Sequence, residues 1–364
     1  MDISSESTHI NQQPHIVWEK GSAYDLFVSL RVLHNPDEYG LRPSWAAGVR
    51  SRLPNDLREI LETSQKFLKV PLSFIHSLPE PRDAAAAISA LEKLSLEEHL
   101  STLFFGTNKD PKTLREKKFF QTLKGKQRLT ASIADNIQQV YLNPKSKTKE
   151  HIRAAFDAWS DPIAFGEKHL KALKAYTNSF YFEEETRITP AQNRSLEEAQ
   201  KLAEGVDVLT LLEKLSTGVR MDWISGISTL ILAPSFWAAP FVYFNRLDEK
   251  TGMILFGSRP DGMRLVPGDL VPQDLLNPLK ALADPTRLRI LRCLLNKPLS
   301  PSELAKTLRL RPPTVIHHLH NLRLAGLVSV TVSPRGDRSY VLRPDGINVT
   351  VAHLISFLSG DSTQ

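Results

Sequence analysis

The chain has 364 residues, of which 41% are hydrophobic and 24% charged, a balance typical of a globular protein with room for two or three domains. No run of about 18 apolar residues occurs, and the first twenty residues contain neither the basic nor the apolar segment of a signal peptide, so a cytoplasmic protein without membrane spans is expected. The single cysteine, Cys293, excludes an intramolecular disulfide and a multi-cysteine metal site.

The net charge of +6 is concentrated at one end of the chain. Residues 1–269 contain 34 Lys and Arg against 34 Asp and Glu, whereas residues 270–364 contain 12 against 6. A neutral large part joined to a small basic part is typical of a regulatory domain attached to a domain that binds a polyanion. The alternative on charge alone is a solvated basic face without a partner.

The first 265 residues are predicted to be mostly helical. Residues 1–14 are polar and aperiodic, so a loose terminus is expected before a regulatory domain at 15–265. Apolar residues spaced by three and four predict helices up to Gly218. The last of them is expected to begin at a capping box formed by Ser195 and Glu198. The predicted helices cover residues 21–33, 53–68, 83–94, 111–143, 149–160 and 195–215.

Beyond Gly218 the pattern changes to short strands. Residues 227–237, 240–245 and 252–258 are rich in β-branched and aromatic residues, which predicts strands with at least one hairpin. We hypothesise that one face of this hairpin lines a pocket for a small apolar or amphipathic effector; an ordinary core between sheet and helices is the alternative. Residues 266–272 are expected to be a linker. The fold class is therefore mainly α with a small β part (α+β).

The segment 273–364 has a chemical marker at each predicted boundary. Four leucines give its first helix an apolar face, and Asp284 followed by Pro285 begins the second helix. The capping box of Ser300 and Glu303 begins a third helix. Pro312 begins a fourth, which Gly326 ends, and two strands with a basic turn follow. This order of elements predicts a winged helix-turn-helix. The four leucines are Leu275, Leu276, Leu279 and Leu282.

The fourth helix carries three of the eleven histidines. At 100° per residue one face is apolar, with His318 at its edge. His317 and His320 lie on the other side and could chelate a metal at i, i+3 spacing, but no third ligand is nearby, so no metal is expected. No nucleophilic side chain accompanies these histidines, so a role as catalytic bases is not expected. Contact with bases and phosphates in the major groove is the better interpretation. The apolar face consists of Val315, Leu319 and Leu322, and the outward side of Pro313, Thr314, His317, His320 and Asn321.

Enzyme motifs are missing from the sequence. There is no GxGxxG, no phosphate loop ending in Lys-Ser or Lys-Thr, no HExxH and no GxSxG. We therefore expect neither catalysis nor a cofactor.

Three consecutive segments, LKALADPTRLRILRCL, LSPSELAKTL and TVIHHLHNLRLAGLV, resemble the DNA-binding domain of ArsR-type transcriptional regulators over about residues 273–343. The resemblance implies a homodimer that binds an operator with two-fold symmetry, usually as a repressor. It also implies that the first helix and the final one, INVTVAHLISFL, form the dimer contact. Residues 15–265 are similar to a large domain attached to some of these regulators, which implies a shared architecture and no further function.

Two departures from the family pattern concern the expected sites. Metal-sensing members carry a cysteine pair in the third helix, whereas this helix is PSELAKTLRL. Ile316 occupies a position where the family commonly has a polar DNA contact. Sensing of a metal through the usual thiolates is therefore not expected, and Cys293 is interpreted as a small packed residue.

The sequence thus predicts a sequence-specific regulator that binds double-stranded DNA as a homodimer, with an unidentified small-molecule effector and no membrane partner. If His317 is protonated on binding, the affinity should fall as pH rises through about 6 to 7. The alternatives are a winged helix that docks a partner protein and a small-molecule enzyme with a DNA-binding tail. Predicted base contacts are Thr314, His317 and Asn321, then Pro313 and His320; predicted phosphate or groove-edge contacts are Arg311, Arg335 and Arg338, with Lys306 and Arg309 beside them.

Overall fold

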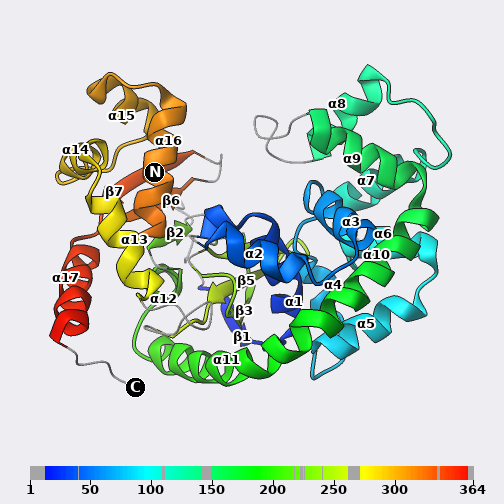
Figure 1. Ribbon diagram of the computed structural model, residues 1–364, viewed down its shortest axis with the longest axis horizontal. Coiled ribbons are helices and arrows are strands. Elements are labelled where there is room, and N and C mark those ends of the chain that lie inside the picture. Colours follow the sequence, from blue (N-terminus) through cyan, green and yellow to red (C-terminus); the bar gives the residue numbers. More distant parts are fainter. Residues whose placement is uncertain are drawn as a thin grey trace, which may run out of the picture.

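The computed structural model describes residues 13–39, 41–108, 111–140, 149–216, 218–221, 224, 226–239, 241–260, 271–333 and 337–359. Helices dominate it, and a four-stranded sheet lies at its centre (Figure 1). Nearly all of the predicted terminus (1–14) and most of the predicted linker (266–272) lie outside the described residues. The mainly α, α+β class is confirmed.

The central sheet has the strand order β1-β3-β5-β4. It consists of β1 (His15–Trp18), β3 (Thr229–Ser235), β4 (Tyr243–Arg246) and β5 (Thr251–Gly257). The β4–β5 hairpin is antiparallel, as predicted, but β1, β3 and β5 run parallel, with Trp18 opposite Leu232 and Leu232 opposite Ile254. The sequence analysis did not predict β1, because four residues are too few to show an alternating pattern.

Helices from the first two hundred residues pack around this sheet. The long helix α11 runs beneath the molecule in Figure 1 and joins its two sides. The bounds are α1 (Ala23–His34), a 3-10 helix (Pro36–Tyr39), α2 (Pro43–Arg50), α3 (Asn55–Gln65), α4 (Leu72–His76), α5 (Ala84–Lys93), α6 (Leu96–Phe105), α7 (Pro111–Gln121), α8 (Ala131–Val140), α9 (Lys149–Ser160), α10 (Pro162–Tyr176), a π-helix (Thr177–Tyr181), α11 (Phe182–Ala203) and α12 (Val208–Leu215).

Two predicted helix boundaries were wrong. Ser195 and Glu198 begin no helix, because both lie inside α11, which also contains Pro190. The next helix, α12, begins later. Asp207 caps it by accepting hydrogen bonds from backbone N–H groups of its first turn. The single helix expected at 111–143 is two helices, α7 and α8. Gly125, at φ +76° between them, adopts a left-handed conformation that favours glycine.

Asp25 ties α1 to the end of β3 inside the core. Its side chain is fully buried and accepts hydrogen bonds from Ser235 Oγ at 2.6 Å, Phe236 N at 2.8 Å, Trp237 N at 2.9 Å and Gln192 Nε2 at 2.5 Å. Burial raises the pKa of Asp25 to about 6 although these donors oppose the shift. One carboxyl group thus fixes a helix, a strand end and α11 relative to one another.

The C-terminal segment forms the predicted winged helix. Its elements are α13 (Gln273–Leu282), α14 (Pro285–Cys293), α15 (Pro301–Leu308), α16 (Pro312–Leu324), β6 (Val328–Val332), β7 (Arg338–Leu342) and α17 (Pro344–Ser359). The wing sheet has an additional strand from the preceding part of the chain, β2 (Val219–Met221), which pairs in parallel with β6. The wing is therefore continuous with the rest of the molecule.

The buried residues form two hydrophobic clusters that do not follow the predicted domain boundary. The larger cluster holds the helices on one side of the sheet. The second contains the core of the winged helix together with Leu211 and Leu212 of α12, Val219 of β2, and Leu232 and Ile254 from the sheet. The winged helix therefore shares a hydrophobic cluster with one face of the central sheet, and α11, α12 and β2 connect the two. No helix in the described ranges is long and apolar enough to cross a membrane.

Candidate nucleic-acid interface

Local sequence signals set the ends of α14 and α15, the two helices that precede α16. Asp284 accepts a hydrogen bond from Arg287 N at 2.9 Å and caps α14, with Pro285 at its first position. Ser300 and Glu303 form the predicted capping box of α15. Arg309, at φ +56°, ends α15 in a left-handed conformation, and Leu310 N donates to Ala305 O at 2.9 Å. This turn aims α16 away from α15.

The apolar face of α16 anchors it in the core, as predicted. Val315, Leu319 and Leu322 are each 0% exposed. His318 lies half-buried at the edge of this face, and burial lowers the pKa of its imidazole. Because three consecutive turns are fixed, the opposite side of α16 is held in one orientation.

That opposite side presents a stripe of polar groups. Thr314 and His317 are exposed and Asn321 is half-buried, at positions i, i+3 and i+7. Asn321 Nδ2 lies 3.2 Å from His317 Nε2, so the two side chains are hydrogen-bonded neighbours on this face. Hydroxyl, imidazole and carboxamide groups on one face can donate to or accept from base edges in a major groove. Pro313 lies exposed beside them.

His320 has a different environment from the one predicted. The imidazole of His320 stacks on the ring of Phe241, with centroids 6.0 Å apart. The guanidinium of Arg323 lies over the Phe241 ring, 5.1 Å from its centroid. Phe241 in turn contacts Tyr39 edge-on at 5.0 Å. Burial lowers the pKa of the His320 imidazole, and the carboxylate of Glu38 opposes this in part. His320 is therefore half-buried against the N-terminal part instead of pointing outward.

The wing supplies one described basic side chain. Arg338, the first residue of β7, is exposed and lies opposite Val332 in the antiparallel β6–β7 pair. Arg335 lies outside the described residues. At the base of the wing Gly218 has φ +93°, and a Cβ there would lie 2.4 Å from Ser329 Oγ, so glycine is required where β2 joins β6.

Three basic residues surround the turn before α16. Lys306, Arg309 and Arg311 are all exposed. Together with Arg338 they place positive charge on both sides of the polar stripe, a distribution suited to two phosphate backbones flanking a groove. Sequence reasoning identified all four of these residues.

The final helix α17 packs against α13 and leaves an apolar face uncovered. Val351 is 50% exposed, Ile355 60% and Leu358 74%. Their i, i+4 and i+7 spacing puts them on one side of the helix. Large apolar side chains gathered on one exposed helix face are typical of a protein–protein contact.

The aromatic residues that follow β3 lie in the core. Phe236 is 0% exposed and Trp237 1%, and Trp237 stacks on Trp45, so these rings fill the core. Among the described residues no group of three or more His, Cys, Asp or Glu side chains could hold a metal ion. Cys293 is half-buried at the end of α14 and packs against the core of the winged helix.

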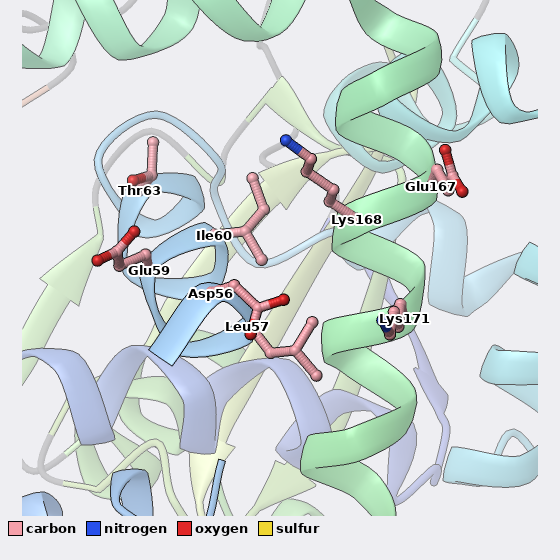
Figure 2. Close-up of a pocket in the computed structure, with 8 residues that line it drawn as sticks. All are labelled: Asp56, Leu57, Glu59, Ile60, Thr63, Glu167, Lys168 and Lys171. Carbon is pink, nitrogen blue, oxygen red and sulfur yellow. The ribbon is translucent and has the colours of Figure 1, made fainter. Parts of the chain in front are cut away.

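A pocket of about 480 Å³ lies elsewhere in the N-terminal part, between α3 and α10 (Figure 2). Its lining mixes carboxylates with the amines of Lys168 and Lys171, and it is open to solvent. This lining does not suit the apolar effector expected at the hairpin. The lining residues are Asp56, Leu57, Glu59, Ile60, Thr63, Glu167, Lys168 and Lys171.

Comparison with known proteins agrees with this geometry. Residues 284–330 match the family described as "Bacterial regulatory protein, arsR family". These residues form an ArsR-type helix-turn-helix. The chain is therefore a DNA-binding transcriptional regulator. A crystal structure of an ArsR family transcriptional regulator is 26% identical over 28% of this chain and 99% of that chain, with a TM-score of 0.22. No curated protein matches the chain.

Sequence reasoning missed the contact of Phe241 with α16. Phe241 and His320 are about eighty positions apart, and nothing in either segment indicates the other. The aromatic run PFVYF predicts a strand of the hairpin and gives no sign of a contact with α16. Arg323, which also meets Phe241, carried no signal beyond its charge.

Proposed function

We propose that this protein is a sequence-specific repressor that binds an operator of two-fold symmetry as a homodimer. In this proposal α16 enters the major groove, where Thr314, His317 and Asn321 contact bases. Arg311 and Arg338, with Arg335 of the wing turn, contact phosphates or groove edges. The protein binds and releases DNA without catalysing a reaction.

The observation that carries the proposal is the two-sided character of α16. One side is locked by Val315, Leu319 and Leu322, while the other presents polar groups between basic residues. A rigid helix with fixed donors and acceptors can discriminate base pairs, whereas a mobile one would contribute affinity without register.

The apolar face of α17 supports the homodimer. Val351, Ile355 and Leu358 would be covered by the same helix of a second copy, because a two-fold interface brings identical patches together. Two copies of α16 would then meet two half-sites one helical turn apart.

An effector would act through the N-terminal part. The stacked rings of Phe241 and His320 connect that part to α16, so a ligand that shifted Phe241 would also shift the reading helix. Thermal shift of the full chain against compound classes tests this component. A complete panel without a stabilising compound would count against a small-molecule effector.

The first test is fluorescence anisotropy with the DNA upstream of the protein's own gene and a scrambled control duplex, each at several salt concentrations. Specific binding predicts at least about a thousand-fold preference for the native duplex, with both affinities falling as salt rises. Coincident curves would overturn sequence-specific regulation and favour the docking of a partner protein. The exposed Ile316, at 51%, would be part of such a docking surface.

A pH series tests the role of His317. Asn321 Nδ2 lies 3.2 Å from His317 Nε2, on the face of α16 that is proposed to contact bases. If binding protonates His317, the affinity should fall as pH rises from about 6 to 7. Constant affinity between about pH 5.5 and 8 would contradict protonation on binding.

A further inference from the structure

The neutral total of the N-terminal part conceals a strongly basic segment. Residues 111–140 and 149–153, here called the basic arm, contain 9 Lys and Arg against 3 Asp and Glu. The remaining residues up to 269 contain 25 against 31. The arm thus has a net charge of +6, as large as that of residues 270–364, whereas the rest of the first 269 residues has a net charge of −6.

The basic arm is a folded projection. It comprises α7, α8 and the first residues of α9, and α8 packs against α9. Phe120, 0% exposed, lies with its ring centroid 4.7 Å from that of Trp159, and Leu123 is 1% exposed. Buried aromatic contacts therefore hold α7 and the loop after it at a defined place on the molecule.

Much of the charge on the arm is exposed. Lys124 pairs with Glu97 of α6 at 2.7 Å, and Lys112 lies 3.9 Å from Glu116. Lys118, Lys126 and Arg128 are exposed, and their side chains form no ion pair with the residues that the structure describes. These three cations raise the local positive potential on this side of the arm.

The arm and the reading helix lie on the same side of the molecule. In Figure 1 both α15–α16 and α7–α9 lie above α1 and α2, on the side of the molecule opposite α11. A duplex seated on α16 would therefore run along a molecule with a second basic projection on the same side.

We propose that the basic arm contacts the phosphate backbone of DNA beside the operator and so lengthens the DNA site beyond the winged helix. The partner is the backbone of duplex DNA, because lysine and arginine chains without a fixed polar frame recognise charge and not base sequence. The inference rests on the proposed function. The basic arm would increase the affinity for DNA and the length of the DNA site, without changing which bases α16 contacts.

The test compares two charge-reversal variants of the full chain. The arm variant is Lys118→Glu, Lys126→Glu and Arg128→Glu; the matched control is Arg194→Glu, Lys201→Glu and Lys214→Glu, exposed residues of α11 and α12 at the base. Two duplexes are used: the native site trimmed to its footprint core, and the same site lengthened by roughly 10 bp at each end, about one helical turn.

Each lost phosphate contact should lower the slope of log K against log salt by about 0.9. Wild type should bind the longer duplex more tightly, and the arm variant should lose that gain, about 10- to 100-fold at moderate salt, with its slope reduced by about 2 to 3. Its preference for native over scrambled sequence, measured on the short duplex, should stay at the wild-type value. The control variant should behave as wild type on both duplexes.

Equal affinity of wild type and arm variant for the longer duplex overturns the inference, as does an equal loss in the control variant. Wild type that fails to discriminate native from scrambled DNA overturns the proposed function instead. If the arm variant melts early, Lys118→Gln, Lys126→Gln and Arg128→Gln replaces it, with the same expected direction and a smaller loss.

Discussion

At the scale of single residues, the three histidines of α16 have three different environments. His318 borders the core, His317 pairs with Asn321 on the exposed stripe, and His320 stacks on Phe241. Helical periodicity predicted the first two assignments, because they depend on the helix alone. The third depends on a residue from another part of the chain.

Alanine substitutions should distinguish the side chains of α16 that contact bases from those that do not. Thr314→Ala, His317→Ala and Asn321→Ala are each expected to reduce the discrimination between native and scrambled duplex by about 1–3 kcal/mol. His320→Ala should reduce it by less than about 1 kcal/mol, because its ring faces Phe241 and not the groove. Anisotropy measures both quantities, and a larger effect of His320→Ala than of His317→Ala would contradict the assignment.

Asp25 should give stability a characteristic pH dependence. Its pKa is raised to about 6 in the folded protein, so the folded state takes up this proton at a higher pH than the unfolded state. The contribution of the carboxyl group to the free energy of unfolding should fall by about 2–3 kcal/mol as pH rises from about 4 to 6, and then level off.

Denaturant unfolding of wild type and Asp25→Asn at pH 4, 5, 6 and 7 isolates this group, because other titrations cancel in the difference. The difference should change between pH 4 and 6. A difference that is constant with pH would show that Asp25 stays ionised in the core.

At the scale of elements, β2 is the feature that joins the wing to the rest of the protein. Val330 N donates to Gly218 O at 3.0 Å, and the paired residues run from Val219–Val330 to Met221–Val332. An added strand satisfies backbone groups of β6 that would otherwise face solvent. The wing therefore moves with α12 and the central sheet.

Gly218→Ala should weaken this junction. The left-handed backbone and the close Ser329 Oγ together predict a loss of about 2–4 kcal/mol in the free energy of unfolding. Gly48→Ala is the matched control: Gly48 lies exposed in α2 with nothing within 4 Å of an added Cβ, so a gain of up to about 1 kcal/mol is expected. Thermal melts check both, and equal effects would disprove the close approach.

At the scale of the whole molecule, two basic regions and one apolar helix face decide how the protein meets its partners. The winged helix and the basic arm project on the same side, while α17 lies at the outer edge beyond α13 (Figure 1). A second copy at α17 would extend the assembly away from the arm. Each basic arm would then lie toward the outer end of the bound DNA.

A charge on α17 should disrupt the dimer. Ile355→Asp places a carboxylate on the apolar face and is expected to yield monomers in sedimentation at micromolar concentration, with at least tenfold weaker operator binding. Ile163→Asp, at a 45% exposed position on α10, is the control and should leave the association state unchanged. Monomeric wild type would rule out the α17 interface.

Most of the winged helix could be predicted from local residue patterns. Asp284, Ser300, Glu303 and Gly326 act on their own helix ends, and the apolar stripe of α16 follows from a repeat of 3.6 residues. These signals are local, so their outcome hardly depends on the rest of the chain. The polar stripe predicted to contact bases could be identified from the sequence because it also follows from the helical repeat of α16.

The contacts between distant parts of the chain could not be predicted from local patterns. Four features join segments that are distant in sequence. They are the parallel pairing of β1 with β3, the addition of β2 to the wing, the contact of Phe241 with His320, and the position of the basic arm on the same side as α16. Such pairings depend on the burial of surfaces that no short window contains. Local chemistry sets an element and its faces, whereas packing selects the neighbour that each face meets.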